Sequence, residues 1–296
     1  MAATTENRGA GLSRAPARRR RSRAGRAPRS RAVGWALDAA ALVGFGVFLI
    51  VLWQLAYELE LVSRFALPSP SATGEELWIV TKNIFEGGYV FDATLYTLYE
   101  IVLGFLLAFG TGLVLGIIAG DTRFGQKVLM PYLVGVNVMP RIAFAPVFVA
   151  WLGFGLAPKV LMAAFIAFFP MVINTALGVR SCSANSLLLF RSMEAGRLKT
   201  LLKLKLPNAL PYIFAGMKTA MVLSVIGAIV AEFLGGSAEG VGELIAISAE
   251  QLAIDKVFAL IIVLSVVGML LYGLIVLLER RVVRWNADQQ GRAGVL

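Results

Sequence analysis

Histidine is absent from this chain of 296 residues, and cysteine occurs once, as Cys182. These absences exclude a metal site built from histidine and cysteine ligands, and they exclude an intrachain disulfide. Neither a Ser–His nor a Cys–His pair is available for nucleophilic catalysis. We therefore expect no cofactor, no metal and no enzymatic activity.

The pattern Gly-x-x-x-x-Gly-Lys-[Ser/Thr] does not occur either, so we expect no loop that cradles the phosphates of ATP. Charged residues make up 16% of the chain, whereas hydrophobic residues make up 58%. This apolar share is above the average for soluble domains. The composition predicts a membrane protein, and active transport by it would need energy from a separate ATPase subunit.

Apolar runs of membrane-spanning length follow one another along the chain. A helix needs about 20 apolar residues to cross the hydrocarbon core. Inside lipid the backbone must satisfy its own hydrogen bonds, so these runs predict an all-α fold of about six transmembrane helices. We place them at 33–57, 97–120, 129–152, 159–181, 211–235 and 257–279, inside a transmembrane domain over 33–285 whose core is about 94–280.

The basic residues predict the orientation of the helices. With both termini in the cytoplasm, the cytoplasmic segments hold 22 Lys and Arg residues and the external segments hold four. Ten of the 28 basic residues lie in the first 31 positions, so we read 1–32 as a disordered, solvated tail that touches anionic lipid. A nucleic-acid arm or an export signal is the alternative for this tail. Residues 286–296 read as a short cytoplasmic tail.

Small residues recur on one face of the second run. Gly112, Gly116 and Gly120 are four residues apart, a spacing that lets two helices approach closely. Packing inside one subunit is the preferred interpretation, and a subunit interface is the alternative.

The third run contains Asn137, Pro140 and Arg141 in mid-span, which predicts a kinked or broken helix. Such breaks are tolerated where they line a protein or water-filled cavity. We therefore read this stretch, with Asn137 and Arg141, as part of the substrate pathway. A satisfied structural kink, with Arg141 snorkelling or paired, is the alternative. Asn174 in the fourth run is a second pathway candidate. Glu232, near the external end of the fifth run, either pairs with Arg141, lines the substrate entrance or lies in interfacial water.

The segment 182–210 is basic, rich in leucine and amphipathic. On helical spacing it can present an apolar face and a basic face, which suits insertion into a partner's groove or a position on the lipid surface. The apolar face is expected from Leu187, Phe190, Leu198, Leu201 and Leu202, and the basic face from Arg191, Arg197, Lys199, Lys203 and Lys205.

Two stretches carry a resemblance to a known family, Lys205-Leu-Pro-Asn-Ala-Leu-Pro-Tyr-Ile-Phe-Ala-Gly216 and Gly227-Ala-Ile-Val-Ala-Glu-Phe-Leu-Gly235. They resemble permease subunits of ATP-binding-cassette (ABC) importers, and the similarity runs from about Leu67 to Trp285. The segment 182–210 is similar to the cytoplasmic coupling loop, or EAA loop, of those permeases. By position, the coupling residues would be Arg191, Glu194, Ala195, Gly196, Arg197, Leu198, Leu201, Leu202, Lys205, Pro207 and Pro211.

The resemblance implies a type I importer permease in the bacterial inner membrane. It implies a homodimer that works with two cytoplasmic ATPase subunits and an extracytoplasmic solute-binding protein. The branch it points to imports nitrate, alkanesulfonates, taurine, and pyrimidine- or riboflavin-like heterocycles, and the sequence leaves these solutes open. A stand-alone channel or secondary transporter, and a membrane enzyme, are the alternative classes.

One position departs from the family pattern. The glycine that usually separates the two short helices of the loop falls on Glu194. We expect Gly196, two residues later, to supply the turn instead.

Overall fold

The computed structural model describes residues 31–63, 66–235 and 239–283. Every regular element in these ranges is a helix, which confirms the all-α prediction. The arginine-rich tail before residue 31, and the chain after residue 283 with Trp285, lie outside the described residues.

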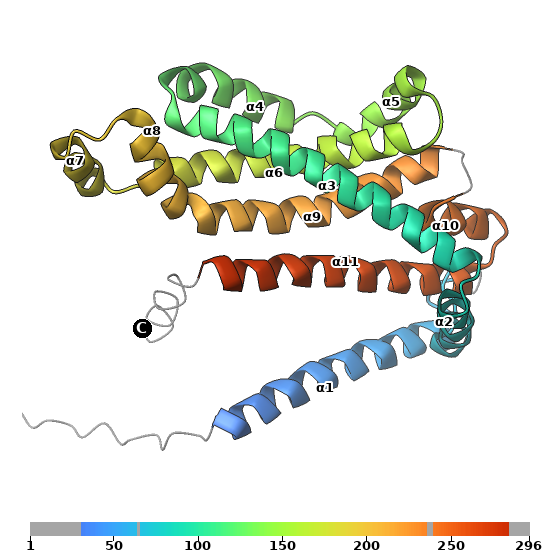
Figure 1. The fold of residues 1–296 in the computed structure, drawn as a ribbon. Helices are drawn as coiled ribbons and strands as arrows, with labels where there is room; N and C mark the ends of the chain where they lie inside the picture. Colours follow the sequence, from blue (N-terminus) through green and yellow to red (C-terminus); the bar gives the residue numbers. More distant parts are fainter. Residues whose placement is uncertain (1–30, 64–65, 236–238, 284–296) are drawn as a thin grey trace, which may run out of the picture. The chain divides into compact units, whose positions relative to one another are not determined.

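The helices follow the apolar runs closely. Long helices cover the predicted spans, and short helices occupy the connections between them (Figure 1). The elements are α1 (Arg31–Glu58), α2 (Pro70–Phe85), α3 (Tyr89–Asp121), η1 (Gly125–Leu129), α4 (Met130–Asn137), η2 (Arg141–Phe144), α5 (Ala145–Leu152), α6 (Leu156–Arg180), α7 (Ala184–Ser192), α8 (Arg197–Thr200), η3 (Leu201–Lys205), α9 (Leu206–Gly235), α10 (Val241–Glu250) and α11 (Ile254–Val282).

Five helical stretches of the described chain are long and apolar enough to cross a membrane. A sixth span is present if the bent pair Gly125–Asn137 and Arg141–Leu152 counts as one. The first stretch, Ala39–Glu58, belongs largely to α1, whose residues up to Leu52 form a unit separate from the rest. The prediction of about six spans is therefore confirmed.

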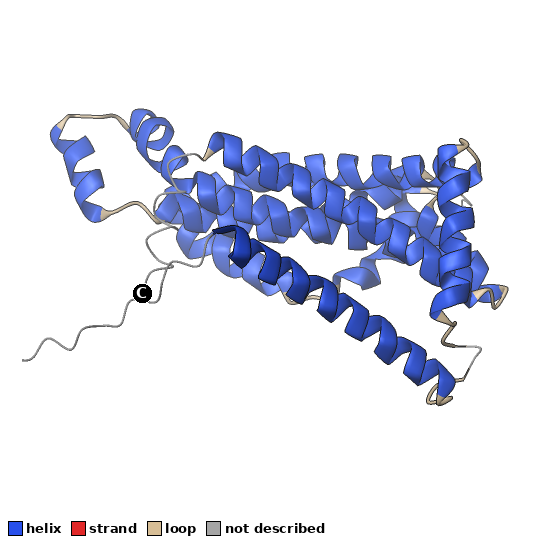
Figure 2. Ribbon diagram, turned by 90° about the horizontal axis from the view of Figure 1, so that it is seen from below, coloured by secondary structure: helices blue, strands red, loops and turns tan. Residues whose placement is uncertain are grey.

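Within the unit that begins at Trp53, α6 packs along α3 and α9 over most of its length (Figures 1 and 2). Glycine makes this close approach possible. A Cβ at Gly112 would meet Met171 at 2.8 Å, and one at Gly120 would meet the Ala176 carbonyl oxygen at 2.8 Å. The glycine face of α3 thus packs against a helix of the same chain, as the preferred interpretation predicted.

The third span is broken where the sequence predicted a break. Helix α4 ends at Asn137, and the two halves of the span differ in direction by 86°. The second half ends in a turn in which Gly153 and Gly155 have φ angles of 76° and 114°. Side chains rarely adopt such angles, so glycine is required there.

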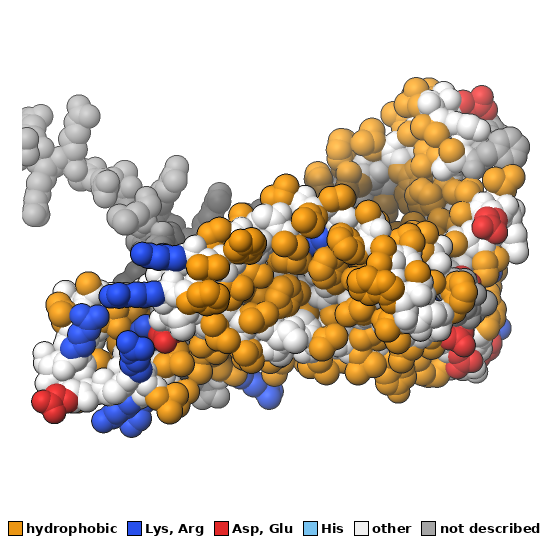
Figure 3. All heavy atoms as spheres, turned by 90° about the horizontal axis from the view of Figure 1, so that it is seen from above, with side chains coloured by type: hydrophobic (Ala, Val, Ile, Leu, Met, Phe, Trp, Pro, Cys, Tyr) orange, Lys and Arg blue, Asp and Glu red, His pale blue; other side chains and the backbone are white. Residues whose placement is uncertain are grey.

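Charged and apolar side chains occupy different parts of the surface along the length of the helices. Lys and Arg side chains gather at the end of the molecule that carries α7 and α8, and apolar side chains cover the middle (Figure 3). Helix α10 lies at the other end, in the connection between α9 and α11 (Figure 1). This separation matches a helical bundle with one polar, basic end.

Candidate functional site: the loop between α6 and α9

The predicted coupling loop contains two short helices at one end of α6 and α9 (Figure 1). Helix α7 begins after Ser183, whose Oγ accepts a hydrogen bond from the Ser186 N–H at 3.1 Å. This is an N-cap, which satisfies one of the free donors at the helix start. Helix α8 begins after Gly196 and continues through η3 into α9. The second half of the loop is therefore continuous with the fifth span, which begins earlier than residue 211.

The turn between the two short helices depends on Glu194. The Glu194 N–H donates to the Arg191 carbonyl at 2.9 Å, and the Ala195 N–H donates to the Phe190 carbonyl at 3.0 Å. These two bonds form a Schellman motif, in which a left-handed residue ends the helix. Glu194 is that residue, with a φ of 53°.

The expectation that Gly196 supplies the turn is wrong, because Gly196 has an extended conformation with a φ of −61°. The chain keeps the left-handed turn at the position where the family has glycine, although glutamate occupies it. The backbone bonds at both sides of Glu194 hold it there.

Two π-helical turns occur in this end of the molecule, and each ends two residues before a proline. The turn η3 precedes Pro207, and η1 precedes Pro131. A proline has no N–H to donate to the carbonyl four residues earlier, and its ring crowds that carbonyl. The wider π turn accommodates this conflict, so the helical path continues across both prolines. Pro211 lies inside α9, one turn further on.

The exposed apolar face of the loop differs in part from the predicted one. Leu198 and Leu202 are exposed as predicted, but Leu201 packs against the core of the bundle. Leu187 and Phe190 are half-buried. The large apolar side chains that are exposed on the loop are Leu188, Leu189, Met193, Leu198 and Leu202.

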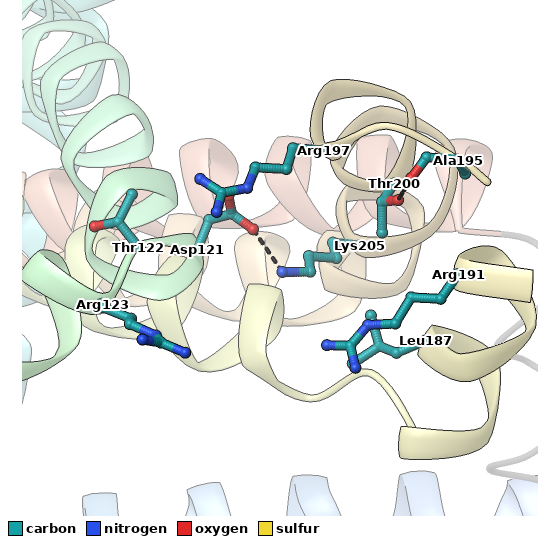
Figure 4. Close-up of a pocket in the computed structure, with 9 residues that line it drawn as sticks. All are labelled: Asp121, Thr122, Arg123, Leu187, Arg191, Ala195, Arg197, Thr200 and Lys205. Carbon is teal, nitrogen blue, oxygen red and sulfur yellow. Dashed lines mark hydrogen bonds and ion pairs between the residues drawn. The ribbon is translucent and has the colours of Figure 1, made fainter.

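A basic cleft of about 640 Å³ lies between this loop and the end of α3 (Figure 4). Lys205 forms an ion pair with Asp121 at 2.5 Å, which fixes the start of α9 to the end of α3. The other charged side chains in the lining are Arg123, Arg191 and Arg197. The cleft therefore carries four cations and one carboxylate. Its lining is Asp121, Thr122, Arg123, Leu187, Arg191, Ala195, Arg197, Thr200 and Lys205.

Arg141 has a structural partner in the described chain. Its Nη1 donates to the Ile166 carbonyl at 2.9 Å, and its guanidinium carbon lies 5.6 Å from the centre of the Phe169 ring. Within α6, the residue that would normally donate to Ile166 is Pro170, which has no N–H. Arg141 thus satisfies the carbonyl that the proline leaves free. The contact favours the structural alternative for this residue.

The four predicted pathway residues are not joined by any contact in the described structure. Asn174 Nδ2 donates to the Pro170 carbonyl at 2.8 Å, and Asn137 is half-buried at the end of α4. The expected pair between Arg141 and Glu232 does not form. Glu232 is 1% exposed and accepts hydrogen bonds from Thr97 Oγ1 at 2.6 Å and from the Gly242 N–H at 2.5 Å. It therefore does not lie in interfacial water.

Sequence reasoning missed the ion pair that lies beside Glu232. Glu100 on α3 and Lys159 on α6 are both fully buried, and Lys159 Nζ is 3.2 Å from Glu100 Oε1. Lys159 is one of the four basic residues that the sequence assigns to the external segments. Opposite charges inside two spans are expected to pair, and Glu100 inside the second run was the signal that could have found the pair.

The comparisons with known proteins agree with this architecture. Residues 112–284 match the model of the family described as "Binding-protein-dependent transport system inner membrane component". The chain belongs to this family. Because the match includes α6, the coupling loop and α9, the permease carries its candidate site inside the matched region.

Several curated relatives cover most of the permease. A Bacillus subtilis protein provisionally named as an aliphatic sulfonates transport permease, SsuC, is 35% identical over 82% of this chain and 86% of its own. The riboflavin transport permease RibX of Chloroflexus aurantiacus is 34% identical over 82% and 88%. The formylaminopyrimidine transport permease ThiX of Halalkalibacterium halodurans is 31% identical over 83% and 95%. These relatives carry the names of transport permeases, not of enzymes.

The family and the apolar helices together identify a multi-pass protein of the bacterial membrane that serves as the permease subunit of an ABC importer. Permeases of such importers work in general with ATPase and binding-protein partners.

Proposed function

We propose that the loop between α6 and α9 is the docking element through which a cytoplasmic ATPase dimer drives this permease. The proposal depends above all on the exposed apolar residues of α7 and α8, which the chain's own core does not cover. Basic side chains surround them, an arrangement that suits a groove with apolar contacts and a charged rim. The residues assigned to coupling remain those predicted, with Leu188, Leu189 and Met193 added and Leu201 assigned to the core.

A pair of substitutions tests the docking. Leu198→Asp with Leu202→Asp places two charges on the exposed face and leaves the core contact of Leu201 intact. We expect the partner ATPase to be lost from the purified complex, while membrane insertion is kept. The matched control is Leu61→Asp with Leu252→Asp, two leucines that are also exposed but lie outside the loop. Equal co-purification of both variants would refute the docking role.

The proposed orientation places this loop and both termini in the cytoplasm. Cys182 is the single cysteine of the chain and lies at the start of the loop, so it reports the side directly. Burial raises the pKa of the Cys182 thiol, against the opposing effect of Lys205, so labelling needs alkaline pH. We expect an impermeant maleimide to label inverted vesicles and not right-side-out vesicles. Phe85→Cys in a Cys182→Ser background, exposed on α2, should give the opposite result.

The broken third span, with Asn137 and Asn174, is proposed to line the translocation pathway of a homodimer. An open apolar cleft of about 420 Å³ borders this break. Glu232 is assigned to the external end of the pathway, where it fixes α10. The binding protein selects the solute in this proposal. The cleft is lined by Pro131, Tyr132, Gly135, Val136 and Met139.

The solute classes that we propose follow the names of the relatives. They are a pyrimidine- or riboflavin-like heterocycle, or an alkanesulfonate, taurine or nitrate. ATP-driven uptake in proteoliposomes, with the neighbouring ATPase and binding protein present, separates the two groups. Uptake by the permease alone would instead support a stand-alone channel or secondary transporter.

A further inference from the structure

The basic cleft beside the predicted coupling loop contains more positive charge than the described residues neutralise. Lys205 is paired with Asp121. Among the described residues, no carboxylate lies within ion-pair distance of Arg123, Arg191 or Arg197. The three arginine side chains, from the α3–η1 connection, α7 and α8, extend toward this space (Figure 4). A bound anion would relieve their mutual repulsion.

The position of the cleft indicates which anion. Asp121 is the last residue of α3 and of one candidate span, and Arg197 is the first residue of another. The cleft thus lies where two candidate spans end, and a span of this kind leaves the hydrocarbon core at its end. Large apolar side chains follow two of the lining residues in the chain: Phe124 comes after Arg123 and is 65% exposed, and Leu188 comes after Leu187 and is 56% exposed. Cations with apolar neighbours at this depth match a phosphate group that carries acyl chains.

Arginine suits this ligand. Its planar guanidinium presents paired donors that match the oxygens of a phosphate, and it stays charged at any pH of interest. We infer that the cleft of Arg123, Arg191 and Arg197 binds the phosphate group of an anionic phospholipid of the surrounding leaflet. The lipid would join the end of α3 to the coupling loop. The inference does not depend on the proposed ATPase docking, and its test contains no ATPase.

Native mass spectrometry of the full-length permease, titrated with phosphatidylglycerol or phosphatidylcholine, tests this inference. The wild type should bind phosphatidylglycerol more tightly than phosphatidylcholine. Replacing all three arginines of the cleft by glutamine should weaken phosphatidylglycerol binding roughly tenfold or more. The matched control removes the same charge at exposed positions outside the lining, as Lys127→Gln, Arg180→Gln and Arg280→Gln, and should change the affinity by less than about threefold.

A variant with the opposite effect strengthens the test. Asp121→Asn removes the carboxylate of the cleft and should tighten phosphatidylglycerol binding, an effect that simple loss of structure would not give. Equal affinities of the cleft variant and the charge-matched control would refute the inference. Displacement of the lipid by inorganic phosphate, with no preference over phosphatidylcholine, would also refute it and indicate a site for a free anion.

Discussion

Removing Lys159 should destabilise the permease more than removing any other single cation of its spans. Lys159 and Glu100 are both fully buried, and their charged atoms lie 3.2 Å apart. Besides this ion pair, Glu100 interacts with the buried carboxyl of Glu232, a second acid that cannot replace the cation. In the Lys159→Met variant the carboxylate would stay buried without compensation, which costs about 3–5 kcal/mol of unfolding free energy. The contact of Lys159 Nζ with the Tyr96 ring, at 4.8 Å, would be lost as well.

The matched control is Lys218→Met. Lys218 pairs with Glu279 at 2.9 Å, but each of these side chains is 25% exposed. Solvent screens the charge that remains, so we expect a loss of about 1 kcal/mol. Unfolding by titration with sodium dodecyl sulfate, followed by tryptophan fluorescence, measures both variants in the same detergent.

The double variant Glu100→Met with Lys159→Met decides between an uncompensated charge and simple loss of packing. Replacing a buried ion pair by apolar side chains of similar volume is often neutral. We therefore expect the double variant to lie within about 1 kcal/mol of the wild type. A double variant as unstable as Lys159→Met alone would refute this reasoning, as would equal losses in Lys159→Met and Lys218→Met.

Two further predictions use the same unfolding assay. Arg141→Met should cost about 1–3 kcal/mol because it leaves the Ile166 carbonyl unpaired, and this cost should disappear in a Pro170→Ala background, where residue 170 regains an N–H for that carbonyl. An equal cost in both backgrounds would contradict the assignment. Glu194→Gly should stabilise the chain by about 1 kcal/mol, because glycine adopts a left-handed φ without strain; a loss of stability would show that the glutamate side chain makes a compensating contact.

The spans and the break in the third one could be predicted because both depend on local properties. Hydropathy and length determine where a helix can cross the membrane. Pro140, beside Asn137 and Arg141, interrupts the third helix wherever the rest of the chain lies. The glycine face of α3 was predictable for the same reason, since its spacing is visible in one segment.

The partners of the charged residues were not predictable in this way. Lys159 is the first residue of an apolar run, a position that also suits an external charge. Its burial depends on Glu100, which lies 59 positions earlier and on another helix. Arg141 likewise depends on Pro170, because the carbonyl it contacts is free only when a proline occupies that position in α6. Such pairings require the distance between helices, which the sequence of a single chain does not contain.

The loop face was predicted in part for a related reason. Helical spacing identified Leu198 and Leu202 correctly but assigned Leu201 to the same surface. On a helix of 3.6 residues per turn, Leu201 lies about 60° to one side of Leu198 and Leu202 about 40° to the other. The bundle can therefore cover Leu201 and leave the other two exposed. Which side the bundle covers depends on how the loop packs, and spacing alone does not give this.

Whether a basic residue of this permease has a partner in the chain indicates whether it has a structural role or belongs to a binding site. Arg141, Lys159 and Lys218 lie in spans, and an ionisable residue there is by default a candidate for the transport pathway. Each of the three has a partner in the chain itself: a carbonyl freed by a proline, and two carboxylates. These cations have structural roles that lower the cost of their burial. The arginines at the end of α3 and in the coupling loop lack such partners among the described residues. These unpaired arginines therefore indicate a binding site more strongly than the paired cations inside the spans do.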